Sequence, residues 1–271
     1  MPAPASQAPA APAVLRLVQE RVFGRWRSSG EELYREVASL LQVGAGHEIL
    51  VAGCGEGTSC EWLARRTGAA VSGVDPDAER VEAADARARE RAEHGEPLPL
   101  AFQQAPYEDL PHETAVFDAA VGEPGLAAAA DAARAIGELA RVTKPMGAVV
   151  LLQLSWSSEL SAEARGLLVE RLGVRPRLIV EWKQMLRDAG VVDLQVQDWT
   201  DAGADGAADE APHLTWQQKA QIVAGAWRHW GWKGARAALE REESLLRELS
   251  RERSIGFQVI RGVKWPHARG A

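Results

Sequence analysis

The chain has 271 residues, a formal net charge of −7 and a sequence pI of about 5.5, and this length suffices for one large domain with a sizeable core. The acidic balance argues against binding of nucleic acid, because that binding depends on clustered Lys and Arg side chains against phosphates. All apolar stretches are too short to span a membrane. Cys54 and Cys60 have no CxxC partner, so we expect neither a zinc site nor a disulfide framework, and a cytoplasmic location.

Residues 1–13 form an uncharged Ala/Pro tail that has neither the basic start nor the apolar run of a secretion signal, and we expect it to be disordered. Apolar residues then recur at helical spacing in residues 14–23 and 31–42, and Arg25–Gly30 interrupts the pattern. Residues 14–45 are therefore predicted to form N-terminal helices.

The stretch His47–Thr58, HEILVAGCGEGT, is the most informative part of the chain. It predicts a buried strand over 48–52, a glycine turn, and a helix over 58–67. The turn glycines are Gly53, Gly55 and Gly57. Glycine lets a backbone approach a ligand closely because it has no Cβ. The dinucleotide fingerprint would place its third glycine at Thr58, and no P-loop lysine follows. A tight turn without a ligand is the alternative.

A second short strand, over 70–75, ends on Asp75. An acid at the end of the next parallel strand can bind the ribose hydroxyls of a nucleoside. The glycine turn and this acid together predict a site for a nucleoside cofactor. An N-cap is the alternative role for Asp75, because Pro76 stands at the helix-opening position with Asp77 in the first turn.

Strand and helix patterns continue to alternate after Asp75, which predicts a parallel sheet with helices on both faces. The expected strands are 99–103, 117–121, 148–154, 193–199 and 256–263, and the expected helices are 77–92, 131–142 and 178–189. Between the last two strands lie an acidic Gly/Ala-rich loop, 201–211, and helical stretches at 214–230 and 233–253. The second stretch offers the i,i+4 pairs Arg236–Glu240 and Glu243–Arg247.

Five segments, taken in chain order, resemble motifs of the class I S-adenosylmethionine-dependent methyltransferases that act on small molecules. The glycine turn resembles their first motif, and Tyr107–Pro111, YEDLP, resembles the end of their adenine-binding motif. The segment Phe117–Leu152, FDAAVGEPGLAAAADAARAIGELARVTKPMGAVVLL, is similar to their passage that ends in R-V-L-K-P-G-G and an apolar strand. Downstream, WKQMLRDAGVVDLQVQDWT and SIGFQVIRGVKW resemble their closing helix and strands.

The resemblance covers roughly residues 31 to 265 and extends to the methyltransferase type 11 and ubiquinone–menaquinone branch. The long helical insert resembles that of enzymes acting on sterols, tocopherols and glycine derivatives. The resemblance implies an α/β, Rossmann-like class I methyltransferase fold, with a seven-stranded, mostly parallel sheet whose last strand is antiparallel. The implied parts are capping helices at 14–45, a cofactor-binding core at 46–200, a helical lid insert at 201–254, and a final strand with a tail at 255–271.

The resemblance also implies S-adenosyl-L-methionine as the cofactor, with the turn glycines beside its methionine part and Asp75 on its ribose. Further residues expected to contact the cofactor are Pro76, Gln104, Tyr107 and Gly122. Pro106 stands where the family has an acid that receives the adenine amino group, so Gln104 or Glu108 is left for this role.

The C-terminal end of the fourth strand is the expected place for acceptor binding, because open parallel sheets bind ligands at that edge. Glu123 is the candidate for substrate contact or proton removal, and a solvated loop acid is its alternative. Residues expected to line the acceptor pocket are Trp26, Tyr34, Trp156 and Trp182, with core packing as the alternative for the tryptophans. A further cluster, Trp227, Trp230 and Trp232, suggests a lid surface or a contact in a homodimer. No His has a ligand-spaced partner, so no metal site is expected.

These features predict an enzyme that transfers a methyl group from S-adenosylmethionine to nitrogen, carbon or oxygen of a small molecule by in-line displacement. Alignment and exclusion of water carry such a reaction, and a base is needed only when the acceptor must lose a proton. The alternatives are methylation of a protein or an RNA, and a non-catalytic protein that binds S-adenosylmethionine.

Overall fold

The computed structural model describes residues 30–156, 165–166, 169, 175–199, 216–251 and 255–266. The chain divides into two compact units. The unit that we call the sheet domain comprises Gly30–Trp156, Val174–Thr200 and Gly256–Ala271, and the other comprises Met1–Ser29, Ser157–Gly173 and Asp201–Ile255. The expected tail at 1–13, the helix at 14–23 and the loop at 201–211 lie outside the described residues.

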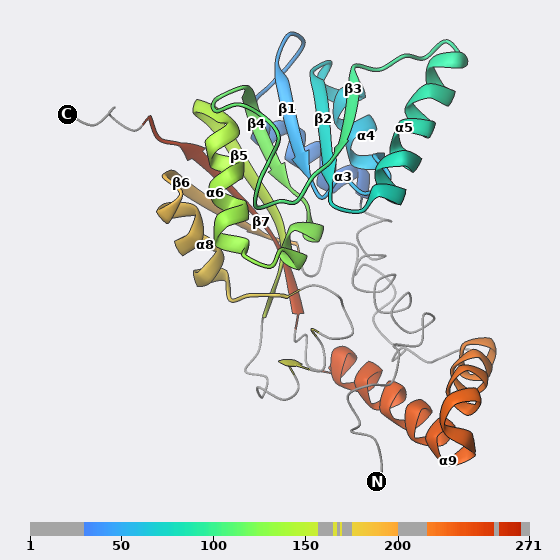
Figure 1. Ribbon diagram of the computed structural model, residues 1–271. Helices are drawn as coiled ribbons and strands as arrows, with labels where there is room; N and C mark the ends of the chain where they lie inside the picture. The colour runs from blue at the N-terminus through green and yellow to red at the C-terminus, as the bar shows by residue number, and fades with distance from the viewer. Residues whose placement is uncertain are drawn as a thin grey trace. The chain divides into compact units, whose positions relative to one another are not determined.

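One seven-stranded sheet forms the sheet domain, with the strand order β3-β2-β1-β4-β5-β7-β6 (Figure 1). Its strands are β1 (Glu48–Ala52), β2 (Ala70–Asp75), β3 (Leu100–Gln104), β4 (Phe117–Gly122), β5 (Thr143–Trp156), β6 (Val191–Asp198) and β7 (Ile255–Lys264). The pairs among β1 to β5 are parallel, and β6 pairs with β7 in the antiparallel direction. The expected class I sheet, mostly parallel with an antiparallel last strand, is confirmed.

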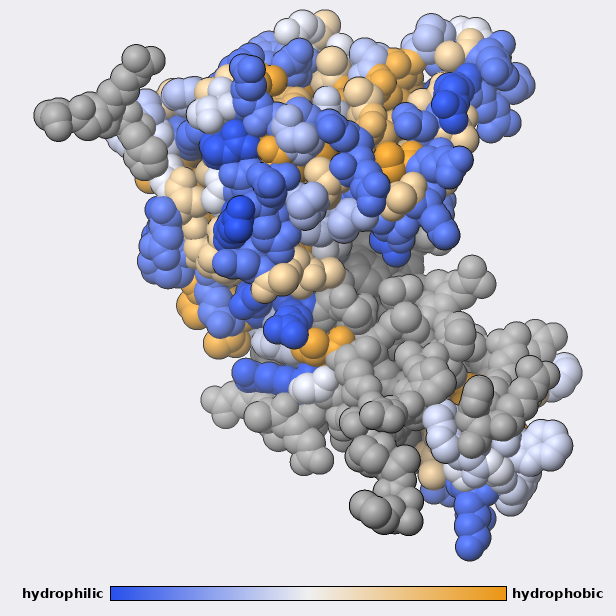
Figure 2. Space-filling model, in the orientation of Figure 1, coloured by the Kyte–Doolittle hydropathy of each residue, from blue (hydrophilic) through white to orange (hydrophobic). Residues whose placement is uncertain are grey.

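Helices cover both faces of this sheet, and in Figure 1 α6 and α8 lie in front of it while α3 and α4 lie behind. The helices are α3 (Gly30–Leu41), α4 (Thr58–Thr67), α5 (Ala78–Glu93), α6 (Ala132–Val142) and α8 (Ile179–Asp188), and a short 3-10 helix, η2 (Pro124–Ala128), follows β4. In α6, Ala135, Ile136 and Leu139 recur at helical spacing and are buried, so the apolar stripe of the helix packs inward. The apolar core is thereby enclosed, and Figure 2 shows mostly hydrophilic residues on the visible outer face of this domain.

The start of α5 differs from the expectation in one detail. Asp77 is the N-cap residue, and its side chain accepts hydrogen bonds from the backbone N–H groups of Glu79 and Arg80. Pro76 therefore precedes the cap and is not the first helical residue. Because Asp77 fills the capping role, the N-cap alternative for Asp75 does not hold.

The strand expected at 148–154 is longer in the structure, where β5 runs over Thr143–Trp156. The sequence Lys-Pro-Met-Gly is typical of a turn, but here the strand passes through it with a shift in register between β4 and β5. Met146 has a φ of 66° at this irregularity. A Cβ on Gly147 would lie 2.5 Å from the carbonyl oxygen of Asp118, so the close approach of the two strands requires glycine there.

Most of the described residues of the second unit form α9 (Trp216–Arg251), in which the two helical stretches expected from the sequence are joined at Gly231, with φ 65° and ψ −172°. The expected ion pair Arg236–Glu240 is present at 2.9 Å. Glu243 pairs at 2.7 Å with Lys219, which lies in the part of α9 before Gly231. The side chain of Arg247, the expected partner of Glu243, lies outside the described residues. Among the described helices, none combines the length and apolar character needed to cross a membrane.

Candidate functional site

The glycine turn follows β1 directly and is held to the end of β2. The backbone N–H groups of Gly53 and Cys54 both donate to the carbonyl of Val74, at 2.8 and 3.2 Å. Gly53, Gly55 and Gly57 have φ values of 86°, 52° and 81°. These values lie in the left-handed region that only glycine enters without strain. The sequence G-x-G-x-G therefore dictates the path of this turn.

Asp75 joins the glycine turn to the start of α5. Its carboxylate accepts hydrogen bonds from the backbone N–H of Gly55 and of Asp77, each at 3.0 Å, and the residue is only 2% exposed. An ionised carboxylate has about four acceptor positions, so two of them are left for hydroxyl donors of a ligand. The geometry therefore fits the ribose-binding role expected for Asp75.

The three turn glycines face different surroundings. A Cβ on Gly57 would lie 2.7 Å from Cζ of Phe102, and one on Gly53 would lie 3.2 Å from Cβ of Glu123. A Cβ on Gly55, in contrast, would meet no protein atom within 4 Å. A Cβ on Gly57 would thus clash inside the protein and one on Gly53 would be tightly packed, whereas Gly55 borders open space.

We expect Gly55→Ala and Gly57→Ala to differ in what they damage. Gly55→Ala should lower the free energy of unfolding by only about 1 kcal/mol, because it adds backbone strain without a clash. The same change should weaken binding of S-adenosylmethionine by about tenfold or more, since the new methyl group occupies ligand space. Gly57→Ala adds a clash with Phe102 and should cost about 2–4 kcal/mol of unfolding free energy.

Denaturant unfolding and calorimetric titration of both variants measure these two effects. If cofactor affinity fell in the same proportion to stability in both variants, the two glycines would not have separate roles.

The residues expected at the adenine lie beside Asp75. Gln104 pairs with Asp75 in the register of β3 and β2, and its side-chain N–H group donates to the carbonyl of Pro76 at 3.1 Å. The carboxylate of Glu108 accepts the backbone N–H of Asp131 at 3.0 Å. Tyr107 is buried, and burial together with the charge of Asp75 raises the pKa of its hydroxyl. Each of the two candidates for the adenine amino group thus makes one hydrogen bond within the protein and keeps an acceptor position for a ligand.

The loop that carries Tyr107 is clamped by α6. The carboxylate of Glu138 accepts the backbone N–H of Leu110 at 2.9 Å and pairs with Arg141 at 2.7 Å. Arg141 in turn donates to the carbonyls of Leu110 and His112, at 3.1 and 2.9 Å. The hydrogen bond from Arg141 lowers the pKa of Glu138, which keeps the clamp charged. The spacing E-x-x-R in this helix therefore has a structural role, since it fixes the loop that carries Tyr107.

Glu123 lies immediately after β4 and is brought against a residue 89 positions earlier. The hydroxyl of Tyr34, on α3, donates to the Glu123 carboxylate at 2.6 Å. Glu123 is 6% exposed. Burial raises its pKa to about 7, and hydrogen bonds from Tyr34 and Ser59 act in the opposite direction. The solvated-acid alternative for Glu123 is therefore wrong.

Two residues that the sequence did not single out also surround this carboxylate. Ser59 lies in the first turn of α4 and hydrogen-bonds Glu123. Gln153 on β5 donates to the carbonyls of Gly122 and Glu123. A lone polar residue inside the apolar run VVLLQL was the available signal for Gln153.

The tryptophans expected in the pocket divide into three cases. Trp182 is fully buried in the core, where its indole N–H donates to the carbonyl of Leu154 and the Arg177 guanidinium lies 5.7 Å from its ring centre. Packing accounts for Trp182, which is therefore a core residue and not a pocket residue. Trp156 is buried at the end of β5, and Trp26 lies outside the described residues. The cluster Trp227, Trp230 and Trp232 is exposed on α9.

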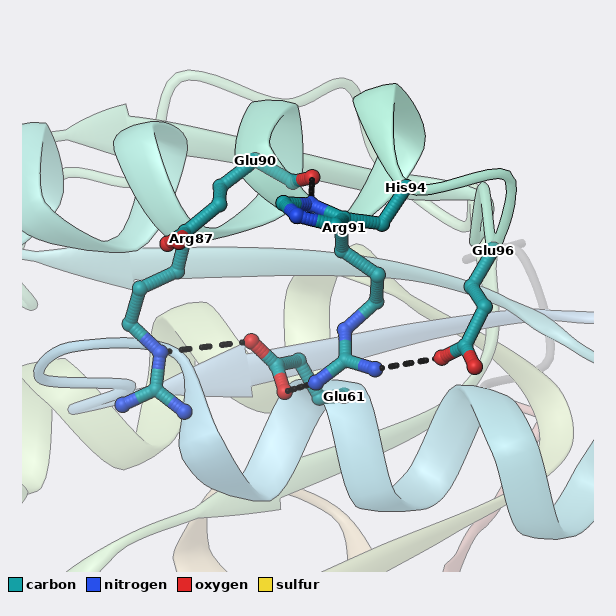
Figure 3. Close-up of a pocket in the computed structure, with 6 residues that line it drawn as sticks. All are labelled: Glu61, Arg87, Glu90, Arg91, His94 and Glu96. Atoms are coloured by element: carbon teal, nitrogen blue, oxygen red, sulfur yellow. Dashed lines mark hydrogen bonds and ion pairs between the residues drawn. The ribbon is translucent and has the colours of Figure 1, made fainter.

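A polar cavity lies between α4 and α5 (Figure 3), lined by Glu61, Arg87, Glu90, Arg91, His94 and Glu96. Glu61 accepts hydrogen bonds from Arg87 and Arg91, at 3.3 and 2.9 Å. Arg91 also pairs with Glu96 at 3.0 Å. Because these opposite charges neutralise one another, we assign the cluster to the packing of the two helices and not to catalysis.

Several known proteins are similar to this chain. Residues 50–151 match the model of the family described as "Methyltransferase domain". The chain is 32% identical over 126 residues to the methyltransferase GfsG of Streptomyces halstedii, and 34% identical over 128 residues to the O-methyltransferase cnsE of Penicillium expansum. Each match covers 46% of this chain and 44% of the relative, so the chain spans less than half the length of these relatives.

The fold is shared with a solved structure of geranyl diphosphate C-methyltransferase from Streptomyces coelicolor, in complex with Mg²⁺, geranyl diphosphate and S-adenosyl-L-homocysteine. The TM-score is 0.65 and the sequence identity 17%, over 89% of this chain and 81% of the other. The strand order, the glycine turn with Asp75 and the family match agree. Residues 50–151 therefore match a methyltransferase domain, and the chain has the class I methyltransferase fold, whose cofactor is S-adenosyl-L-methionine.

Proposed function

We propose that this protein transfers a methyl group from S-adenosylmethionine to a small molecule whose accepting oxygen or nitrogen carries a proton, and that Glu123 removes this proton. The single observation that carries the proposal is the buried carboxylate at the end of β4, with a pKa of about 7 and a hydrogen bond from Tyr34. A general base works best when its pKa lies near the operating pH. The similarity to an O-methyltransferase supports an oxygen acceptor.

The residues on the cofactor side would bind and orient the two reactants. Asp75 would accept hydrogen bonds from the ribose hydroxyls, Gln104 would lie at the adenine, and the space beside Gly55 would hold the methionine part. S-adenosylmethionine supplies a methyl group on a sulfonium, which is a good leaving group. The protein then needs chiefly to hold the acceptor in line at near-attack distance and to exclude water.

The residues on the acceptor side would handle the proton. As the acceptor atom forms its bond to the methyl carbon and the carbon–sulfur bond breaks, the acceptor proton passes to the Glu123 carboxylate. The hydroxyl of Tyr34 stabilises the ionised carboxylate before the transfer, since hydrogen bonds to a charged acceptor are stronger than those to a neutral one. Burial opposes this ionisation and keeps the carboxylate basic enough to accept the proton.

Calorimetric titration followed by transfer of an isotope-labelled methyl group tests this proposal. We expect the protein to bind S-adenosylmethionine and to label members of a panel of phenols, alcohols and amines, detected by mass spectrometry. Binding without transfer to any of these compounds, but with transfer to a protein or RNA fraction, would contradict the small-molecule proposal. Binding without any transfer would favour a non-catalytic role.

Tyr34→Phe should move the pH dependence of the reaction upward. The change removes a hydrogen bond that lowers the pKa of Glu123, so the pH at half-maximal kcat should rise by about one unit. At pH 7 we expect kcat to fall about fivefold and to recover at pH 9. Steady-state rates between pH 6 and 9.5 measure the shift. A loss of kcat that persists at pH 9 would mean that Tyr34 acts in another way.

A further inference from the structure

Gln153 is a fully buried amide in the middle of the apolar core. It lies on β5, which pairs with β4, the strand that leads into Glu123. Gly122 is paired with Leu151, and β4 ends there while β5 continues to Trp156. Gln153 therefore lies beside the point where the chain leaves the sheet. An apolar side chain would fit the surrounding core strand better, since a buried amide needs hydrogen-bond partners.

The side-chain nitrogen of Gln153 donates hydrogen bonds to two consecutive backbone carbonyls at the point where the chain leaves β4. It donates to the carbonyl of Gly122 at 3.2 Å and to the carbonyl of Glu123 at 2.9 Å. Its own side-chain oxygen is buried and has no hydrogen-bond partner among the described residues. The position thus uses both donors of the amide and leaves the acceptor unused, which indicates that donation to these two carbonyls is the purpose of the side chain.

These bonds complete the fixation of the Glu123 backbone. The N–H group of Glu123 donates to the carbonyl of Ala52 at 2.9 Å, so the residue is held from β1 through its N–H and from β5 through its carbonyl. With the backbone fixed on both sides, the carboxylate keeps its direction toward Tyr34. An error of about 1 Å in the position of a reacting group can cost about a hundredfold in rate.

We propose that Gln153 is a positioning residue that aims the Glu123 carboxylate at the acceptor. This inference rests on the proposed role of Glu123 as the base. It assigns to Gln153 an effect on the chemical step, with the cofactor site at Asp75 and Gly55 left intact.

Two substitutions of Gln153 test the proposal. Gln153→Met keeps the length of the side chain but has no donor, so we expect kcat to fall about tenfold or more while the Kd for S-adenosylmethionine stays within about twofold. Gln153→Glu can donate only when it is protonated, and its ionised form would face two carbonyl oxygens. Its kcat should therefore fall as the pH rises from 6 to 9, whereas the wild-type rate should rise through pH 7.

Gln258 offers the matched control. It is a buried glutamine on β7 whose side-chain oxygen also has no partner among the described residues, and the structure gives it no bond to the Glu123 backbone within that part of the chain. Gln258→Met and Gln258→Glu should leave kcat and its pH dependence close to those of the wild type. Circular dichroism shows whether each variant is folded, and Gln153→Asn, which keeps the amide but shortens its reach, replaces Gln153→Met if that variant does not fold.

A double-mutant cycle separates positioning from a general loss of structure. In a Glu123→Gln background, Gln153→Met should have no further effect on kcat, because the base that it aims is already gone. An equal loss in both backgrounds, or a wild-type pH profile for Gln153→Glu, would overturn the inference. If Glu123→Gln itself keeps full activity, the proposed base is wrong. If Glu123→Gln is inactive but the Gln153 variants keep wild-type activity, only the positioning role of Gln153 is wrong.

Discussion

Asp75→Ala is expected to weaken binding of S-adenosylmethionine by about 1.5–3 kcal/mol, the range for losing hydrogen bonds to a charged group. The ribose hydroxyls would lose their acceptor, and the backbone N–H of Gly55 would lose the carboxylate that now holds the glycine turn. Both losses should act on the same ligand, since Gly55 borders the open space proposed for its methionine part. Calorimetric titration of the folded variant measures the change.

Asp118→Ala is the matched control for this prediction. The Asp118 carboxylate also accepts one backbone N–H, from Glu48 at 2.9 Å, and a second donor, Lys144 at 2.8 Å. It lies at the opposite edge of the sheet, where β1 and β4 begin. We expect this variant to lose stability and keep its cofactor affinity. An unchanged affinity in Asp75→Ala, or an equal loss in Asp118→Ala, would remove Asp75 from the cofactor site.

The cofactor half of the site could be predicted because its geometry is set by local sequence. The glycine positions fix the turn after β1, and the alternation of short strands and helices fixes the parallel pairing of β1 with β2. Two such strands bring their C-terminal ends to one edge, so a turn after the first and an acid ending the second must meet there. The observed bond between Gly55 and Asp75 is the consequence.

The acceptor half could be predicted only in part. The sequence predicts the position of Glu123 at the end of β4, but the burial of Glu123 and its hydrogen bond with Tyr34 depend on how α3 packs against the sheet, which no local pattern encodes. Gln153 acts through the backbone of a neighbouring strand, so its role depends on the register of β4 and β5. Trp182 is predicted to line the pocket but lies in the core, because an aromatic residue with a polar N–H fits a core as well as a pocket.

Glu123→Gln should lower kcat by about a hundredfold or more and leave the Kd for S-adenosylmethionine nearly unchanged. General base catalysis contributes typically about 10²–10⁴-fold, and the amide of Gln cannot accept the proton. The residue is not among those that hold the cofactor turn, which depends on Asp75 and Val74. Steady-state kinetics with saturating cofactor measure the loss. An unchanged kcat would show that the acceptor needs no base or that another group serves.

The same substitution should make the protein more resistant to unfolding at alkaline pH. The pKa of Glu123 is about 7 in the folded protein, above the 4.5 usual for a glutamate side chain, so the folded state binds the proton more tightly than the unfolded chain. Proton binding by Glu123 therefore stabilises the folded state fully below about pH 4.5. This stabilisation, on the order of 3 kcal/mol, is lost as the pH rises through 7. Relative to the wild type, Glu123→Gln should therefore gain unfolding free energy between pH 5 and 8.

Glu138→Gln provides the comparison with the opposite sign. Its hydrogen bond to Arg141 lowers the pKa of Glu138, so the contribution of this carboxylate is present above the unfolded pKa and is lost as the pH falls. Denaturant unfolding of both variants and the wild type at pH 5 and 8 distinguishes the two carboxylates. If Glu123→Gln showed no gain in unfolding free energy over the wild type at pH 8, the pKa of Glu123 would not be raised in the folded protein. The argument that Glu123 acts as a base near pH 7 would then fail. A gain together with a loss of kcat would mean that the protein keeps a destabilising group because the reaction needs it.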